Sequence, residues 1–193
     1  MARIAFIVAN DFEDSEFRVP YDTVRRAGHE AVIIGVEAGK KLQGKKGKET
    51  VTPEKAVKEV SAKDFDALVI PGGYSPDHLR MDIGMVGFVR DFYRADKPIA
   101  AICHAGSLLV EADIADGRTL TSWPSIKTDL LNAGARWVDR EVVEDGNLIT
   151  SRNPGDLPVF SEALLRQVTE GVAPRLESPL VFETLSNQPP TLH

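Results

Sequence analysis

The sequence predicts a single α/β domain with an open, mostly parallel central sheet and helices on both faces. Two observations lead to this fold class. Short continuous apolar runs rich in Ile and Val, typical of strands buried on both faces, recur along the chain, and segments with helical periodicity separate them. We find no internal repeat and no linker before residue 172, so we expect one domain over residues 1–172.

The first third of the chain predicts a strand, a helix and a second strand. Residues 3–9 form the first apolar run, and acidic residues follow it directly. A helical pattern then carries Phe17, Tyr21 and Val24 on one face and ends near Gly28, a residue that commonly terminates helices. The next apolar run, residues 31–36, completes a βαβ unit.

The same order returns in the middle of the chain. Residues 67–70 predict a strand, residues 86–93 a helix, and residues 98–102 another strand followed by a segment that can be helical. Later, residues 141–143 and 148–150 flank an Asp-Gly-Asn sequence, which is typical of a hairpin turn.

The last residues, 173–193, have no clear periodicity and contain four prolines. We expect an irregular tail there. An alternative to a frayed terminus is that its apolar residues dock on this subunit or a neighbouring one; they are Leu180, Val181, Phe182 and Leu185.

Composition excludes several classes of partner and location. The formal net charge is −6 with a pI near 5.3, so we expect no docking site for nucleic acid and no attraction to anionic membranes. The apolar run at the N-terminus is too short for a signal peptide or a membrane span. Cys103 is the only cysteine, so no intrachain disulfide can form, and a reducing cytoplasm is the expected compartment.

Ligands of open α/β sheets bind beyond the carboxyl ends of the strands. That rule selects three segments of this chain as candidates for the site. They are residues 10–16, 71–77 and 103–106.

The third segment holds Cys103 where a buried strand turns directly into a helix between small residues. This pattern is typical of a nucleophile elbow, in which small neighbours permit a sharp turn and the helix N-terminus stabilises a thiolate. We therefore expect a reactive thiol. The alternative is a small buried apolar cysteine with no chemical role.

In the second segment, Gly72 and Gly73 follow a strand directly. Glycines there let backbone N–H groups approach a ligand, so with the N–H that follows Cys103 they predict an oxyanion-binding turn. The alternative is an ordinary strand-to-helix turn.

A thiol nucleophile needs a base, and His104 is adjacent in the sequence. Neighbouring residues on an elbow usually point in different directions, so a direct contact is not guaranteed. Asp77 is the nearest carboxylate that could orient the imidazole, although an Asp after Ser-Pro is also a common helix cap. His78 is the competing base, whereas His29 and His193 lack any such context.

Glu16, in the first segment, lies four residues before Pro20, which should kink or start the helix there. An acid facing the thiol would either keep its proton and donate a hydrogen bond, or ionise and raise the pKa of the thiol. The alternative is an acid that complements the helix dipole, and it applies equally to Glu13, Asp14 and Glu16.

Three other patterns are set aside. The sequence GKKLQGKK, residues 39–46, nearly matches a P-loop, but Lys46 replaces the required Ser or Thr, so we expect a hairpin with solvated lysines. One cysteine and four scattered histidines provide no zinc-site spacing, and we expect neither metal nor cofactor. No GxSxG motif is present.

Four motifs in order make the chain resemble the ThiJ/PfpI family over about residues 3–170, in the branch that contains PfpI-type peptidases and bacterial stress proteins. The motifs are DFEDSEFRVPYDTVRRAGHE, DALVIPGGYSPDHLR, KPIAAICHAGSLL and DGNLITSRNPGDLP.

The resemblance implies a flavodoxin-like three-layer sandwich that assembles as dimers or hexamers. It implies Cys103 as the nucleophile, His104 as its histidine, and Glu16 as the acid that bonds the thiol. Asp77 matches a position where peptidases of the family carry a Glu that reaches the histidine across a subunit interface. Gly72 and Gly73 match the oxyanion-hole turn.

The function implied is a cytoplasmic stress-response cysteine hydrolase acting on methylglyoxal, glyoxal or their adducts. Two alternatives stay open. One is an intracellular cysteine peptidase that uses Cys103, His104 and Asp77. The other is a redox sensor or chaperone in which Cys103 is oxidised and no turnover occurs.

Overall fold

The fold is that of a computed structural model, which describes residues 1–177. The four apolar residues proposed to dock from the tail, Leu180, Val181, Phe182 and Leu185, lie outside the described residues.

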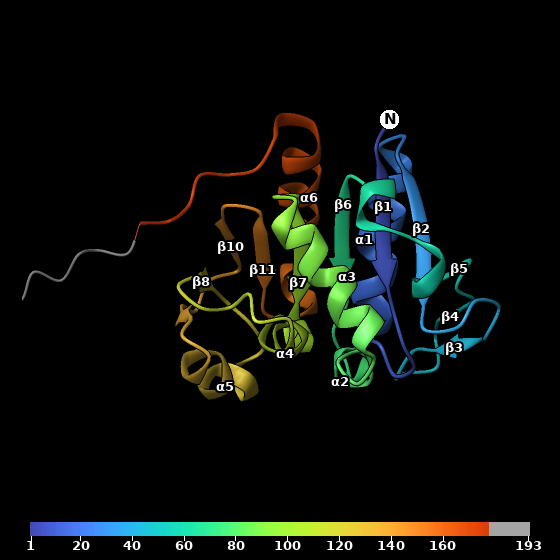
Figure 1. The fold of residues 1–193 in the computed structure, drawn as a ribbon, viewed down its shortest axis with the longest axis horizontal. Helices are drawn as coiled ribbons and strands as arrows, with labels where there is room; N and C mark the ends of the chain where they lie inside the picture. Colours follow the sequence, from blue (N-terminus) through green and yellow to red (C-terminus); the bar gives the residue numbers. More distant parts are fainter. Residues whose placement is uncertain (178–193) are drawn as a thin grey trace, which may run out of the picture.

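A seven-stranded sheet forms the middle of the molecule, in the order β10-β11-β7-β6-β1-β2-β5 (Figure 1). Its strands are β1 (Arg3–Ile7), β2 (Glu30–Gly35), β5 (Lys55–Ala56), β6 (Ala67–Ile70), β7 (Ile99–Ile102), β10 (Val142–Asp145) and β11 (Leu148–Ser151). Every neighbouring pair is parallel except β10 and β11. The expected mostly parallel sheet is confirmed, and the strands predicted from apolar runs occur within two residues of their expected bounds.

Two small sheets accompany the large one. An antiparallel pair is formed by β3 (Leu42–Gln43) and β4 (Thr50–Val51), and a parallel pair by β8 (Thr119–Leu120) and β9 (Arg136–Trp137). The segment of residues 42–51, called the lysine hairpin below, is the hairpin expected around GKKLQGKK.

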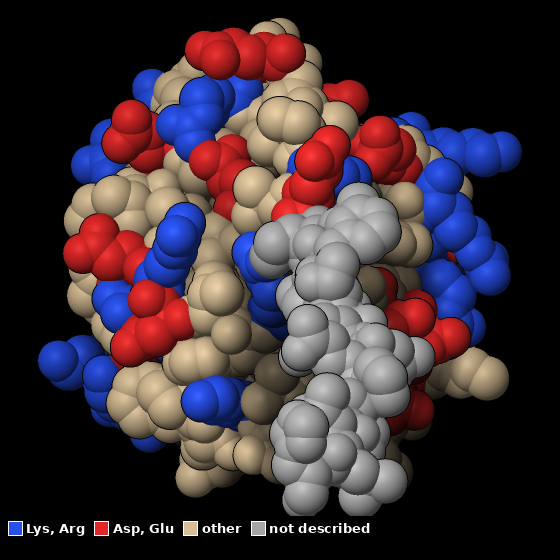
Figure 2. Space-filling view, turned by 90° about the vertical axis from the view of Figure 1, so that its left-hand side faces the viewer, with Lys and Arg blue, Asp and Glu red and all other residues tan. Residues whose placement is uncertain are grey.

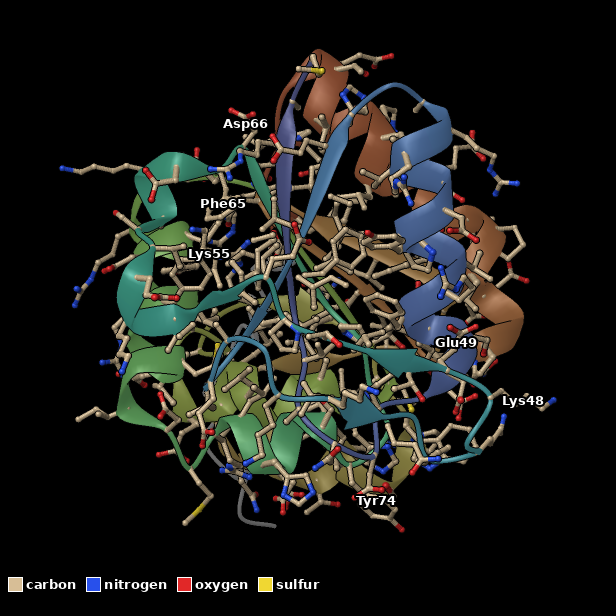
Figure 3. The ribbon with its side chains drawn as sticks, turned by 90° about the vertical axis from the view of Figure 1, so that its right-hand side faces the viewer. Lys48, Glu49, Lys55, Phe65, Asp66 and Tyr74 are labelled. Atoms are coloured by element: carbon tan, nitrogen blue, oxygen red, sulfur yellow. The ribbon has the colours of Figure 1, made fainter. Side chains whose placement is uncertain are left out.

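Helices cover both faces of the sheet. In Figure 3 the sheet is seen between α1 and α6 on the right and the green helices α2 and α3 on the left. The helices are α1 (Asp14–Arg26), α2 (Ser75–Leu79), α3 (Ile83–Arg94), α4 (Gly106–Glu111), α5 (Lys127–Asn132) and α6 (Leu157–Glu170). Short 3-10 turns are η1 (Val57–Glu59), η2 (Ala62–Asp64), η3 (Cys103–Ala105), η4 (Pro124–Ile126) and η5 (Pro154–Asp156).

The strands alternate between two apolar layers, as a sheet buried on both faces requires. Along β1, Phe6 packs with the α1 and α6 residues of one layer, whereas Ala5 and Ile7 pack with the α3 and α4 residues of the other. This is the three-layer sandwich that the family resemblance implied.

Two expectations about local structure are corrected. Pro20 lies inside α1, which begins earlier at Asp14, so the proline does not start the helix. The helix α6 was not anticipated, although its apolar residues Phe160 and Leu164 have helical spacing and are fully buried.

After α6, residues 171–177 form neither helix nor strand. They nevertheless contact the domain. Arg175 Nε and the backbone N–H of Leu176 both donate to the buried carboxylate of Asp145, over 3.0 and 2.7 Å. Figure 2 shows that acidic and basic side chains are mixed over the face from which this segment leaves the domain.

Residues 1–177 lack two kinds of feature. None of their helices combines the length and apolar character required to traverse a bilayer. In the same range, no group of three or more His, Cys, Asp or Glu side chains is placed to hold a metal ion.

Candidate active site

The three segments selected from the sequence meet at one edge of the sheet. Strands β7, β6 and β1 are consecutive neighbours and run parallel, so their carboxyl ends lie side by side. Residues 103–106, 71–77 and 10–16 follow these three ends. They lie at the lower edge of the sheet in Figure 1, beside α2 and the lysine hairpin.

Cys103 occupies the turn between β7 and α4. Its φ angle is +63°, in the left-handed region that non-glycine residues rarely adopt, and its side chain is 6% exposed. Such a backbone costs on the order of 1 kcal/mol and persists only where the surroundings hold it. The Cys103 carbonyl accepts the backbone N–H of Trp123 over 3.1 Å, which ties the elbow to the segment before α5. The cysteine therefore lies at a tight strand-to-helix turn, and its role as a nucleophile stays a prediction.

Glu16 projects from the first turn of α1 and is fully buried. Its Oε2 accepts the backbone N–H of Gly72 over 2.8 Å. Its Oε1 has no hydrogen-bond partner among the described residues, and the carboxyl is near enough to the Cys103 thiol for each group to change the pKa of the other. A protonated carboxyl can donate to the sulfur.

The pKa values of this pair are coupled. Burial raises the pKa of Glu16 to about 8, so its carboxyl keeps the proton at pH 7. Burial and the ionised form of Glu16 raise the pKa of Cys103 to about 12. Because Glu16 is neutral at pH 7, the charge that opposes thiolate formation is absent there. Of the two states considered from the sequence, the protonated acid is the one favoured.

Backbone N–H groups surround the sulfur. Those of Gly73 and His104 bond to Cys103 and favour its thiolate form. Gly73 has a φ of +74°, and a Cβ on Gly72 would lie 2.7 Å from the Cβ of Cys103 and 2.5 Å from Glu16 Oε2. The position of Gly72 therefore requires a residue without a side chain, which lets this turn approach the cysteine.

His104 contacts the thiol directly, with 3.3 Å between its Nδ1 and Cys103 Sγ. Its Nε2 lies 3.2 Å from Ser125 Oγ, and its ring is 6.4 Å from that of the partly exposed Trp123. Burial, with the positive charge of Lys45, lowers the pKa of His104, so the imidazole is neutral at pH 7 and can accept a proton.

Asp77 and His78 lie on α2, outside this contact network. The Asp77 side chain is exposed, and among the described residues it has no hydrogen bond to His104, whose Nε2 faces Ser125. His78 Nε2 is 3.5 Å from Asp11 Oδ2, and the imidazole lines a separate cavity of about 260 Å³. His29 is remote as well, and its Nδ1 accepts the backbone N–H of Ala2. Among the described residues, the competing base His78 therefore has no hydrogen bond to the sulfur.

The lysine hairpin also reaches the site, which corrects the expectation of solvated lysines. Lys45 Nζ lies 2.8 Å from Glu13 Oε2, and Lys46 Nζ lies 2.6 Å from Glu13 Oε1. Glu13 is 2% exposed. Burial by itself opposes its ionisation, but the hydrogen bonds and charges of the two lysines lower its pKa, so it is a buried carboxylate.

Sequence reasoning missed Lys45, Ser125 and Trp123 as neighbours of the elbow. The lysine is far from Cys103 along the chain, and Ser125 and Trp123 follow β8, which lies outside the main sheet. The rule that ligands bind beyond the carboxyl ends of parallel strands applies only to the main sheet, and no spacing in the sequence connects these residues to the cysteine.

A family comparison agrees with this geometry. The model of the DJ-1/PfpI family matches residues 2–167. The chain belongs to the DJ-1/PfpI family. That match covers the sandwich and all the segments around Cys103, so the resemblance noted from the four motifs is confirmed.

Curated relatives of this DJ-1/PfpI chain carry enzymatic and stress-related names. The chain is 50% identical to protein/nucleic acid deglycase 2 of Escherichia coli K12 over 165 residues, which are 85% of this chain and 96% of the relative. It is 45% identical to general stress protein 18 of Bacillus subtilis (84% of this chain, 95% of the relative) and 45% identical to the putative cysteine protease YraA of the same organism (84% and 96%). These names support the conclusion that the protein is an enzyme.

Solved structures support the fold. A two-domain protein of Anabaena variabilis with DJ-1/ThiJ/PfpI-like and ferritin-like domains superposes with a TM-score of 0.87 at 38% identity, covering 89% of this chain and 49% of that one. Drosophila melanogaster DJ-1beta superposes with a TM-score of 0.81 at 31% identity, covering 86% and 90%.

Proposed function

We propose that the protein is a cysteine-dependent hydrolase that converts methylglyoxal, glyoxal or their adducts on amines to hydroxy acids, as part of a cytoplasmic stress response. One observation carries the proposal: the Cys103 thiol sits at a strained elbow among Glu16, the imidazole of His104 and two backbone N–H groups. The deglycase relative at 50% identity supports the choice of substrate class.

The first step is addition of the sulfur to the aldehyde carbon. Cys103 gives its proton to His104, the thiolate attacks, and the carbonyl oxygen of the substrate takes a proton from Glu16 to form a hemithioacetal. The N–H groups of Gly73 and His104 stabilise the oxygen while it is negative. With an amine adduct as substrate, the sulfur displaces the protonated amine and reaches the same intermediate.

The second step is an internal redox isomerisation. The proton on the sulfur-bearing carbon is removed and a proton is added to the neighbouring carbonyl carbon. The first carbon is thereby oxidised to a thioester and the second reduced to an alcohol, so no external oxidant or cofactor is needed. Water then hydrolyses the thioester, which releases lactate from methylglyoxal and restores the thiol.

The test is lactate formation from methylglyoxal by the purified protein. Cys103→Ala should lower the rate by more than about 10³-fold, because the covalent step is lost. Thr169→Ala, a truncation at the exposed end of α6, serves as the control and should retain the wild-type rate. Equal lactate formation by Cys103→Ala and wild type would overturn the proposal.

The second candidate function is a cysteine peptidase active in an assembled homo-oligomer. The exposed carboxylate of Asp77 supports it, because α2 packs against η3, which contains His104, and leaves this carboxylate free for a neighbouring subunit. The putative protease at 45% identity supports it further. In this case Asp77 orients His104 of a second copy of the chain.

A further inference from the structure

The imidazole of His104 lies between a thiol and a hydroxyl. Its Nδ1 is 3.3 Å from Cys103 Sγ, and its Nε2 is 3.2 Å from Ser125 Oγ, so each ring nitrogen has a partner of its own. Among residues 1–177, the contact with Nε2 is the only hydrogen bond of the Ser125 hydroxyl. The steps derived above for Cys103, His104 and Glu16 do not use this hydroxyl.

The two ring nitrogens cannot play the same part. A neutral imidazole has one N–H donor and one acceptor nitrogen, so the partner of one nitrogen fixes the role of the other. To take the proton of the Cys103 thiol, Nδ1 must be the acceptor, and Nε2 then carries the hydrogen and donates it to Ser125 Oγ. In the opposite tautomer, Nδ1–H faces the sulfur and the ring cannot accept the proton of the thiol there.

The exposed side chain of Ser125 is held at the ring by its backbone. On one side, the N–H of Trp123 donates to the Cys103 carbonyl over 3.1 Å, and on the other the N–H of Ile126 donates back to the Trp123 carbonyl over 3.3 Å. A Cβ on Gly106 would lie 3.1 Å from Ile126 Cδ1, so η4 packs directly on the start of α4. The hydroxyl and the thiol are thus positioned from one elbow.

The segment that leads to η4 is anchored as well. Ser122 Oγ accepts Trp137 Nε1–H over 3.0 Å, and the N–H of Thr121 donates to Thr150 Oγ1 over 3.0 Å. Thr150 lies on β11, which pairs with β7, the strand that ends at the cysteine. Ser125 therefore belongs to a segment fixed on the main sheet, and its distance from the imidazole is set by the fold.

We propose that Ser125 is a positioning residue: its Oγ accepts the Nε2–H of His104 and so keeps Nδ1 in the form that can take the proton of Cys103. It acts through the imidazole and need not touch a substrate. The inference deepens the chemistry proposed for this site, because it names the group that orients the histidine within one subunit. The peptidase alternative gives that role to Asp77 of a second copy, which would need the same single hydrogen.

Nitrogen NMR of protein labelled at its histidines distinguishes the two neutral tautomers. A His104→Gln variant identifies the signals of His104 among those of the four histidines. At pH 7 to 8 the wild type should hold the hydrogen on Nε2, whereas Ser125→Ala lacks the acceptor and should show a mixture of both tautomers. The control is Thr128→Ala, an exposed truncation on α5 three residues further along the chain, which should match the wild type.

Alkylation of Cys103 by iodoacetamide, followed by intact mass, shows whether the tautomer affects the thiol. Ser125→Ala should slow alkylation at pH 7 by about 2- to 10-fold, the effect of one hydrogen bond between neutral groups. Ser125→Thr keeps a hydroxyl and should restore both the tautomer and the rate. Ser125→Asp offers a carboxylate to the same N–H and should raise the pKa of His104 by about 1, measured from the pH dependence of its NMR signals.

A change in Ser125→Ala that Ser125→Thr reverses supports the proposal, because a purely structural role of an exposed side chain would not select one tautomer. The same tautomer and alkylation rate in Ser125→Ala and Thr128→Ala would overturn it, and so would a Ser125→Thr variant that behaves like Ser125→Ala. Neither measurement uses turnover, so failure of the proposed lactate formation would leave this result unaffected.

Discussion

Cys103 and Glu16 occupy one buried site, where ionising both groups at once would cost a large electrostatic free energy. The fold resolves this by keeping the proton on Glu16, whose carboxyl is fully buried and accepts a single N–H bond among the described residues. Burial of this acid has a consequence for stability. Its pKa rises from 4.5 to about 8 in the fold, and each unit between these values corresponds to about 1.4 kcal/mol.

Glu16→Gln should therefore change how stability depends on pH. Between pH 4.5 and 8 the folded state holds a proton that the unfolded state has lost, so Glu16 makes the free energy of unfolding fall as pH rises. The stability it contributes is complete below pH 4.5. Gln cannot ionise, so from pH 5 to 8 the wild type should lose roughly 4 kcal/mol more than the variant, measured by urea unfolding. Parallel stability curves for the two proteins would contradict this expectation.

At the scale of elements, the lysine hairpin is the part of the site with the least core of its own. It contains two two-residue strands, and its position depends on Asp14. Burial opposes ionisation of Asp14, but the backbone N–H groups of Lys46, Glu49 and Lys48 lower its pKa, so the carboxylate is charged and accepts all three bonds.

Asp14→Ala should release the hairpin while leaving the sheet intact. The loss of three bonds to a charged acceptor should cost about 2–3 kcal/mol, measured by urea unfolding. Hydrogen exchange should become fast at the amides of Lys46 and Lys48, whereas protection in β6 and β7 should persist. Asp22→Ala, which removes an exposed partner of Arg18 on the same helix, should cost less than about 1 kcal/mol. Unchanged exchange in the hairpin would show that other contacts position it.

At the scale of the whole molecule, the sheet order brings the three candidate segments to one edge, and the exposed side chain of Asp77 has no intramolecular partner among residues 1–177. The peptidase hypothesis requires a second chain to complete this arrangement. The homo-oligomer, and the absence of a nucleic acid docking site inferred from the net charge of −6, remain predictions.

Mixing two inactive variants tests whether Asp77 acts across an interface. Cys103→Ala and Asp77→Asn should each lose peptidase activity when measured alone. In a mixed oligomer, Asp77 of the first subunit would complete the site of the second, so activity should return to roughly a quarter to a half of wild type. Light scattering after chromatography verifies the assembly. No recovery in a verified mixed oligomer, or no peptidase activity in the wild type, would remove this hypothesis.

The sequence by itself determined the fold class and predicted which segments would meet around Cys103. Apolar runs of strand length fixed β1, β6 and β7, and because residues that follow parallel strands gather at one edge, Glu16, Gly72 and Cys103 were recognisable as neighbours. Tertiary structure alone decided the rest. The contacts of His104 with Sγ and Ser125, the protonated state of Glu16 and the capture of Lys45 and Lys46 by Glu13 depend on burial and on contacts between segments far apart in the chain. Local sequence patterns show neither burial nor such long-range contacts, because desolvation and charge pairing arise only once the layers have packed.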